Sequence, residues 1–192
     1  SSLKGNDVPI MKNLVFDYDK VTSIAIAGNS GSGKSYVLTY LLSLLRNFSD
    51  LVLIDPKFDT PSRWARKYQI PVIHPHENRS KSDFLSEVNE NLSQCLTIIH
   101  KRQAILFENP RHEFKHRTIV IDEVLALSEG VNKNIKDSFF SLLSQIALLG
   151  RATKVHLLLV SQRFDHMTIP VSVREQLNVL IQIGNINQKT TQ

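Results

Sequence analysis

Eight residues near the N-terminus have the types and the spacing of a phosphate-binding loop. Residues 28–35 match the pattern G-x-x-x-x-G-K-[S/T] at every fixed position. Glycines let such a loop curl so that its backbone N–H groups face a phosphate. Lys34 would reach the β- and γ-phosphates of a bound nucleotide, and the Ser35 hydroxyl would ligate Mg²⁺. The sequence therefore predicts a site for ATP and Mg²⁺ formed by Gly28, Asn29, Ser30, Gly31, Ser32, Gly33, Lys34 and Ser35.

Two adjacent carboxylates could complete an ATP-hydrolysing site. Asp122 and Glu123 directly follow the apolar run at residues 118–121, which is typical of a buried strand. Ligands of parallel α/β sheets lie at the C-terminal ends of the strands, so both carboxylates would face the loop. We expect Asp122 to hold Mg²⁺ through water and Glu123 to orient and deprotonate the attacking water. An Asp-Glu pair alone is equally compatible with a surface turn, and the complete loop upstream favours the hydrolytic interpretation.

Polar and cationic residues flank another apolar run, at residues 155–160. Gln162 follows this run, and from a strand end its side chain could touch both the γ-phosphate and the attacking water, so we assign it as a sensor. Because charge develops on the γ-phosphoryl oxygens, a nearby guanidinium would lower the barrier. Such an arginine finger is often supplied by a neighbouring subunit. The candidates are Arg151 and Arg163, and a solvated or structural arginine is the alternative for each.

These residues need a sheet to position them. Short apolar runs predict strands, and apolar residues at three- and four-residue spacing predict helices. We expect strands at 21–27, 51–54, 118–121, 155–160 and 179–183, a short extra strand at 71–73, and helices at 34–46, 83–107 and 135–149. This alternation implies right-handed crossovers and a parallel sheet covered on both faces. We expect Gly150 to end the last helix.

The glutamate beside Asp122 refines the fold class. It is typical of NTPases whose base is a carboxylate and in which another strand separates the two motif strands. Numbering the main strands in chain order, we predict an α/β, RecA-like P-loop NTPase with the spatial order 5-1-4-3-2. Residues 1–20 would form an N-terminal lead-in, and residues 21–192 would form the ATPase motor domain.

Composition limits the remaining classes. The chain has 192 residues, 42% of them hydrophobic, and a single cysteine, which suits one α/β domain without a disulfide framework or a cysteine-based zinc site. No apolar run approaches the ~20 residues of a membrane-spanning helix, and the N-terminus has no signal-peptide pattern. The net charge of +5 mildly favours an anionic partner, although many plain domains carry a similar charge. We expect a cytoplasmic protein, with any attachment to the inner face of the cell membrane made by segments outside this chain.

Together these segments resemble the motor domain of the FtsK/SpoIIIE DNA translocases, in the HerA-FtsK group of P-loop ATPases. Beyond the loop and the acidic pair, the similar segments are Leu53–Lys57, Gly150–Leu157 and Val160–Arg163. Conjugative coupling ATPases of mobile elements share this pattern. The resemblance implies a homo-oligomeric ring, typically a hexamer, with ATP between subunits and double-stranded DNA in the central pore. Where the translocases usually carry Thr-Gln-Arg-Pro, this chain has Ser-Gln-Arg-Phe at residues 161–164.

In that family, pore loops follow the acidic pair and the fourth strand. The corresponding segments here run from Ser128 to Lys136 and from Phe164 to Glu175. The residues they offer for contacts with DNA are Lys133, Lys136, Arg163 and Arg174. Their contacts with phosphates would be independent of base sequence and sensitive to salt. Solvated side chains on ordinary loops are the alternative interpretation.

Three functions are compatible with these features. The leading hypothesis is ATP-driven translocation of double-stranded DNA by an FtsK-like ring motor in DNA transfer or segregation. The main alternative is a motor of the same group that drives protein secretion, whose turnover DNA would not stimulate. The third is a module in which ATP binding only closes a ring, and the presence of Glu123 argues against it.

Overall fold

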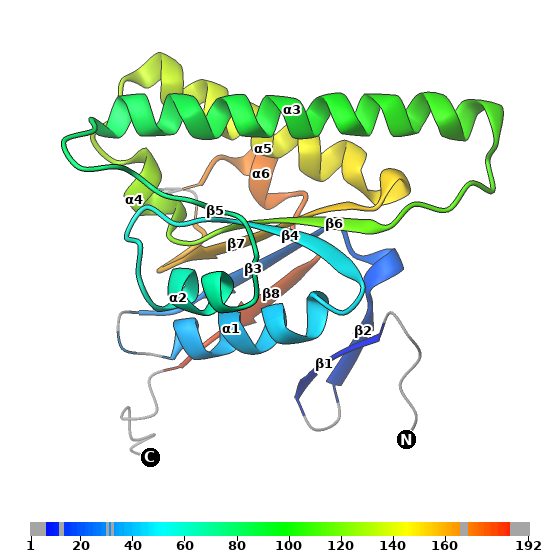
Figure 1. The fold of residues 1–192 in the computed structure, drawn as a ribbon, viewed down its shortest axis with the longest axis horizontal. Coiled ribbons are helices and arrows are strands. Elements are labelled where there is room, and N and C mark those ends of the chain that lie inside the picture. The colour runs from blue at the N-terminus through cyan, green and yellow to red at the C-terminus, as the bar shows by residue number, and fades with distance from the viewer. Residues whose placement is uncertain (1–6, 12–13, 30, 32, 166–168, 185–192) are drawn as a thin grey trace.

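Strands and helices alternate along the chain, as the apolar runs predict (Figure 1). The computed structural model describes residues 7–11, 14–29, 31, 33–165 and 169–184. The elements are β1 (Asp7–Met11), β2 (Leu14–Asp17), the 3-10 helix η1 (Tyr18–Lys20), β3 (Ser23–Ala27), α1 (Lys34–Leu45), β4 (Ser49–Ile54), α2 (Thr60–Lys67), β5 (Val72–Ile73), α3 (Lys81–Glu108), β6 (His116–Ile121), α4 (Val124–Ser128), α5 (Lys133–Thr153), β7 (Val155–Ser161), α6 (Val171–Arg174) and β8 (Val179–Gln182). None of the helices in these ranges has the length and apolar character needed to cross a membrane.

The central sheet has six parallel strands in the order β5-β4-β6-β7-β3-β8. Taken from β8, this is the predicted order 5-1-4-3-2 with the short β5 added outside β4, so the fold prediction is confirmed. β7 lies between β3, which leads to the phosphate-binding loop, and β6, which leads to the acidic pair. Ala27 pairs with Ser161 and Ile121 pairs with Leu159. This register brings the C-terminal ends of the three strands to one edge of the sheet.

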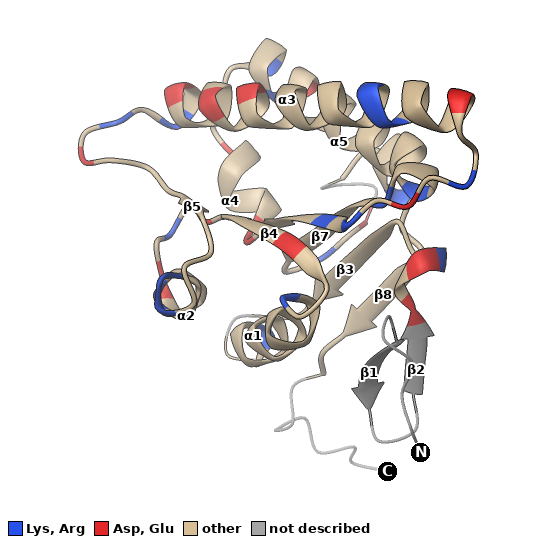
Figure 2. Cartoon of the chain, turned by 45° about the vertical axis from the view of Figure 1, so that its right-hand side comes forward, with Lys and Arg blue, Asp and Glu red and all other residues tan. Residues whose placement is uncertain are grey.

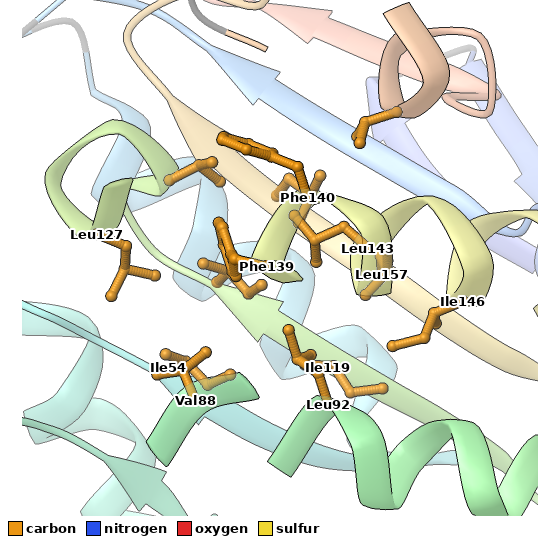
Figure 3. Close-up of a cluster of buried hydrophobic side chains, with 14 of the residues drawn as sticks. Ile54, Val88, Leu92, Ile119, Leu127, Phe139, Phe140, Leu143, Ile146 and Leu157 are labelled. Carbon is orange, nitrogen blue, oxygen red and sulfur yellow. The ribbon is translucent and has the colours of Figure 1, made fainter. Parts of the chain in front are cut away.

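Helices cover both faces of the sheet. α3, α4, α5 and α6 pack on one face, and α1 and α2 pack on the other (Figure 1). β7 contributes to both cores, because Leu157 and Leu159 join the cluster under α3 and α5, whereas Leu158 and Val160 join the cluster against α1. Figure 3 shows the first of these clusters between α3, α5 and the strands. Every residue of β7 is buried, as expected for an inner strand of a parallel sheet.

Gly150 does not end α5, contrary to the sequence prediction. The helix continues to Thr153, and Lys154 follows it with a left-handed φ of 58°. Gly150 is needed for a different reason, because a Cβ at this position would collide with the carbonyl oxygen of Val155. The missing side chain therefore allows the end of α5 to lie directly against the start of β7.

A buried polar cluster anchors the segment that precedes β3. Tyr18 is fully buried, its hydroxyl lies 2.7 Å from Thr118 Oγ1, and its ring stacks on His156 with 3.9 Å between centroids. His156 Nε2 lies 2.8 Å from His116 Nδ1, and His116 Nε2 lies 2.9 Å from Asp19 Oδ1. Part of the predicted lead-in thus packs with the domain.

Burial favours the neutral form of both histidines of this cluster. The 2.9 Å approach of Asp19 Oδ1 to His116 Nε2 favours the tautomer with its proton on Nε2, and His116 Nδ1 would then accept the Nε2–H of His156. Burial lowers the pKa of His156 to about 3, with the neighbouring His116 as the second cause. Burial also lowers the pKa of His116, against the opposing effect of Asp19. An additional proton on either ring would therefore destabilise the fold.

We expect His156 to lower the free energy of unfolding as the pH falls from 7 to 5, an effect that Asp122, whose pKa burial raises to about 7, opposes over the same range. A group with a depressed pKa in the folded state contributes stability above its unfolded pKa, ~6.5 for histidine, and this contribution is lost as the pH falls toward the folded pKa. For His156 alone the loss over this range is about 2 kcal/mol. Urea unfolding at several pH values measures it.

The non-titrating variant His156→Gln should lack this contribution, so its free energy of unfolding should rise relative to that of the parent as the pH is lowered from 7 to 5. The matched variant His100→Gln changes an exposed histidine of α3 and should keep the contribution. An unchanged pH dependence in His156→Gln would show that this cluster does not set the acid sensitivity.

Candidate nucleotide-binding site

The phosphate-binding loop joins β3 to α1. Gly28 leaves the end of β3, and its N–H donates to the carbonyl oxygen of Ser161 on β7 at 3.3 Å. Gly33 is the N-cap of α1 with φ of 93°, a conformation that any side chain would strain. Lys34 and Ser35 open the helix, so its positive N-terminal end faces the loop. Ser30 and Ser32 of the predicted site lie outside the described residues.

The acidic pair lies at the end of β6, in contact with the loop. Lys34 Nζ lies 3.0 Å from Glu123 Oε1, and these side chains are only 11% and 9% exposed. Glu123 adopts φ of 64° at the turn from β6 into α4. This left-handed conformation is uncommon for a residue with a side chain and is often found at functional sites. The structure thus brings the two predicted motifs together through a direct ion pair.

A third carboxylate, which the sequence analysis did not assign, lies at the same edge. Asp55 follows β4 and is fully buried. Its Oδ1 accepts the N–H of Lys57 at 3.0 Å, and its Oδ2 accepts the N–H of Asp59 at 2.9 Å and the hydroxyl of Ser62 at 2.5 Å. These bonds fix the turn that leads into α2. An aspartate directly after a buried strand was the signal that identified Asp122, and it applies to Asp55 equally.

Asp122 differs from Asp55 in its electrostatics. Burial raises the pKa of Asp122 to about 7, and the negative charges of Asp55 and Glu123 add to the effect. A carboxylate in this environment is stabilised strongly by a cation, which offsets the repulsion of its neighbours. Mg²⁺ commonly takes one or two protein oxygens and completes its shell with phosphate oxygens and water. The Ser35 hydroxyl and the Asp122 carboxylate fit this pattern.

A cavity of about 320 Å³ opens between these residues. Its lining includes the predicted residues Asn29, Gly31, Gly33, Lys34, Ser35, Asp122, Glu123 and Gln162. Lys57 and Asp59 also line it and were missed from the sequence. An adjoining cavity of about 420 Å³ shares Asn29 and Gln162 and extends to Arg163 and the end of β8. The predicted sensor Gln162 therefore lies beside the phosphate-binding loop.

The two candidate finger arginines lie at opposite edges of the sheet. Arg163 follows β7 at the nucleotide edge, with Nε 3.6 Å from Asp165 Oδ2. Arg151 is exposed in the last turn of α5, just before β7 begins. The seven residues of β7 separate Arg151 from the site by roughly 20 Å of strand. Arg151 could therefore act only on the nucleotide of a neighbouring copy.

The first predicted pore loop is much shorter than expected. Of the segment Ser128–Lys136, only residues 129–132 lie outside helices, because α4 ends at Ser128 and α5 begins at Lys133. The Asn132 side chain caps α5 by accepting the N–H of Asn134 at 2.9 Å, which is why the helix starts earlier than its apolar pattern suggests. Lys133 and Lys136 are exposed in the first turn, and Lys133 Nζ lies 3.4 Å from Asp137.

Arg174 does not lie beside these lysines. In the second predicted loop, α6 occupies Val171–Arg174, and residues 166–168 lie outside the described residues. Arg174 Nε donates to the carbonyl oxygen of Ile169 at 3.1 Å, so its guanidinium is held against its own segment. Ser144 of α5 bonds to Ser172 of α6, roughly 16 Å along the helix from Lys133. Figure 2 shows Lys and Arg at several separate places on the described chain rather than in one stripe.

Comparison with known proteins defines the class. Residues 19–167 match the family described as AAA domain, and the chain belongs to this family. The FtsK domain-containing protein YdcQ of Bacillus subtilis is 24% identical in an alignment 189 residues long, which covers 92% of this chain and 37% of YdcQ. The chain is also similar to P-loop ATPases of the FtsK–HerA type, which confirms the resemblance found in the sequence.

Three solved structures share the fold. The pCW3 conjugation coupling protein TcpA with ATPγS has a TM-score of 0.65 at 21% identity, covering 94% of this chain and 55% of TcpA. EssC (ATPases 2 and 3) from Geobacillus thermodenitrificans has 0.66 at 14% identity, covering 93% and 37%. The type VII secretion ATPase EccC of Thermomonospora curvata has 0.61 at 22% identity, covering 85% and 21%. The chain therefore spans only part of the length of each relative.

The ion pair between Lys34 and Glu123 leads to opposite expectations for two variants. Lys34→Ala should abolish detectable ATP binding and turnover, because the phosphates lose their cation. Glu123→Gln should bind ATP at least as tightly as the parent, because the amide no longer holds the lysine, while turnover falls by roughly 100-fold or more. Binding of a fluorescent ATP analogue and phosphate release measure the two effects separately.

Glu129→Gln is the matched control, since Glu129 is exposed just beyond α4, and both quantities should stay at the parent level. Normal hydrolysis by Glu123→Gln would exclude this residue as the base.

Proposed function

We propose that this chain is the ATP-hydrolysing motor domain of a ring-forming translocase that moves double-stranded DNA during DNA transfer or segregation. The observation that carries the ATPase part is the meeting of Lys34 and Glu123 in one cavity at the nucleotide edge of the sheet. The DNA part is supported by the likeness to an FtsK domain-containing protein and to a conjugation coupling protein. The domain would work in the cytoplasm, where ATP is available.

The ion pair offers a way for nucleotide binding to prepare the base. The Glu123 carboxylate binds the Lys34 ammonium, and a γ-phosphate would compete for the same ammonium. Once a phosphate holds Lys34, the carboxylate loses its partner and is free to accept a proton from water. ATP binding would then also release the base, because the γ-phosphate replaces Glu123 as the partner of Lys34.

The other residues of the cavity would orient the reactants. Ser35 and Asp122 would hold Mg²⁺, which would neutralise the charge that develops on the phosphate oxygens. Gln162 shares the cavity with Glu123, so its amide could orient the water that Glu123 deprotonates. Lys57 adds a second positive charge to the lining.

In a ring, a neighbouring subunit would supply an arginine finger to this site. Arg151 lies at the edge opposite its own phosphate-binding loop, so it would act as a finger for the adjacent subunit. Such an interface is heterologous, because one copy presents its loop and the next presents the end of α5, and repeated contacts of this kind close into a ring. A hexamer is the expected size from the family.

The cargo would contact cations at the nucleotide edge. Lys133 and Lys136 at the start of α5 and Arg163 after β7 are exposed, so movements of the nucleotide site could reach them through short connections. Arg174 is a weaker candidate because its Nε is bonded to Ile169. Contacts from these side chains would bind phosphates and not bases.

Protein secretion is the second candidate function. EssC and EccC have TM-scores of 0.66 and 0.61, in the same range as the 0.65 of TcpA. The separation of Lys and Arg into several places (Figure 2) also suits a polypeptide cargo. ATPase stimulation distinguishes the two candidates, because duplex DNA would stimulate only the DNA motor.

If Arg151 is a finger in trans, turnover per chain should rise with protein concentration as subunits meet. Arg151→Ala and Glu123→Gln should each be nearly inactive, and their mixture should recover part of the activity. In a mixed ring, some interfaces pair an intact Glu123 with an intact Arg151 of the next subunit. Steady-state phosphate release across a concentration series and a mixing series measures this.

Arg111→Ala, in the exposed loop before β6, is the matched control. Its mixture with Glu123→Gln should release no more phosphate than the intact interfaces of the Arg111→Ala subunits account for. Full turnover by Arg151→Ala would eliminate this finger, and Arg163 would be tested next.

For a DNA motor, affinity of the assembled ring for duplex DNA should be nearly independent of sequence. It should fall by roughly 0.9 log unit per log unit of salt for each phosphate neutralised. The double variant Lys133→Ala, Lys136→Ala should bind all duplexes more weakly and show a flatter salt dependence. Fluorescence anisotropy with unrelated duplexes over a salt series measures both.

The double variant Lys67→Ala, Lys101→Ala removes the same charge from α2 and α3 and should keep the parent slope. An assembled ring that fails to bind duplex DNA at ~50 mM salt would favour the protein-secretion candidate.

A further inference from the structure

The outer side of β4 is covered by a strand over only part of its length. On its inner side, β4 pairs with β6 from Ser49 to Ile54. On its outer side, β5 pairs only with Leu53 and Ile54. Within the described residues, the stretch from Ser49 to Val52 therefore has no neighbouring strand on that side. This is a lateral edge of the sheet, distinct from the C-terminal edge that holds the nucleotide site.

Two backbone features explain why β5 cannot extend along β4. Leu53 N–H donates to the Pro71 carbonyl at 2.9 Å, and Asp55 N–H donates to the Ile73 carbonyl at 2.9 Å. In this parallel register the Leu51 carbonyl would need the N–H of residue 71, and proline has none. The Leu51 N–H would need the carbonyl of Gln69, which instead turns with φ of 59° at the end of α2. Leu51 thus directs a backbone donor and a backbone acceptor outward.

A groove of about 610 Å³ follows this edge. It is lined by residues 49–52 of β4, by the turn Tyr68–Pro71 and by Asn91 of α3. An extended chain of four residues is ~13 Å long, which matches the unpaired stretch of β4. The groove therefore has the length and the hydrogen-bonding groups for one added strand.

The lining of the groove is positively charged. Arg46, Lys115 and Arg117 line it, and Asp50 is the only acidic residue among the described residues that do. Asp50 is already bound to Lys115 at 2.8 Å. Arg117 Nε is buried and has no hydrogen-bond partner among the described residues. Burial lowers the pKa of Arg102 nearby, the positive charge of Arg117 adds to this effect, and the Asp50 carboxylate opposes it.

We propose that this edge binds an extended, acidic segment of a partner protein, which adds to the sheet as a further strand beside β4. Backbone bonds to Leu51 would set its register, and its alternate side chains would face Arg46 and Arg117. This inference goes beyond the proposed ATPase function and does not depend on it. Duplex DNA also carries negative charge, but it has no strand backbone to pair with Leu51.

A labelled hexapeptide of alternating valine and glutamate is a suitable probe for the 192-residue chain. Fluorescence anisotropy should detect its binding, and a peptide with lysine in place of glutamate should bind at least tenfold more weakly. A peptide N-methylated at alternate positions, which removes the N–H groups on one side, should also lose at least tenfold. Hydrogen exchange of the Leu51 amide, followed by NMR, should slow when the valine-glutamate peptide binds.

Arg117→Gln should weaken peptide binding roughly tenfold, since it removes charge-assisted bonds. Arg63→Gln changes an exposed arginine of α2 outside the groove and should leave binding unchanged. Circular dichroism confirms that both variants are folded.

Three results would overturn the proposal. These are no binding at ~1 mM peptide, well above the micromolar range of many recognition segments, equal binding of the N-methylated peptide, or unchanged exchange at Leu51. Displacement of the peptide by duplex DNA with the same dependence on Arg117 would reassign the groove to nucleic acid. Dimers on size exclusion that dissociate when the peptide is added would reassign it to a second copy of this chain.

Discussion

All strands of the central sheet run in the same direction, and this constraint determines where the chemistry lies. In such a sheet, the segment that leaves each strand emerges at one common edge. β3 delivers the phosphate-binding loop there, β4 delivers Asp55, β6 delivers the acidic pair and β7 delivers Gln162. Residues far apart in sequence meet because buried apolar strands fix the register, so the hydrophobic cores on both faces hold the site together.

The three carboxylates at this edge have different environments and therefore different tasks. Asp55 is satisfied by hydrogen bonds from Lys57, Asp59 and Ser62, so it shapes a turn. Glu123 is balanced by Lys34, so its charge is available only after the lysine finds another anion. Within the described part of the chain, the Asp122 carboxylate has no hydrogen bond or ion pair, and burial together with the charges of Asp55 and Glu123 raises its pKa. A ligand that brings both phosphate and a cation would complement these three environments.

The sequence predicted the strand order and most of the residues that line the candidate site, because motifs and apolar runs mark them, but it did not predict Lys57 and Asp59. The loop motif is contiguous, and apolar runs mark every main strand. Gly150 was misjudged because its close approach to Val155 leaves no trace in helical periodicity. The Tyr18–Thr118 bond joins residues 100 positions apart, and no local pattern reports such a contact. The start of α5, by contrast, could have been predicted from Asn132, whose side chain caps the helix.

The close junction at Gly150 has a mechanical consequence. Since no side chain separates the end of α5 from the start of β7, Arg151 is fixed to one end of that strand while Gln162 follows its other end. Strands on both sides hydrogen-bond to β7, which makes this strand of seven residues rigid. A displacement of Arg151 by an adjacent molecule would therefore be transmitted to Gln162, beside the candidate nucleotide site of this molecule, because no hinge lies between the two residues.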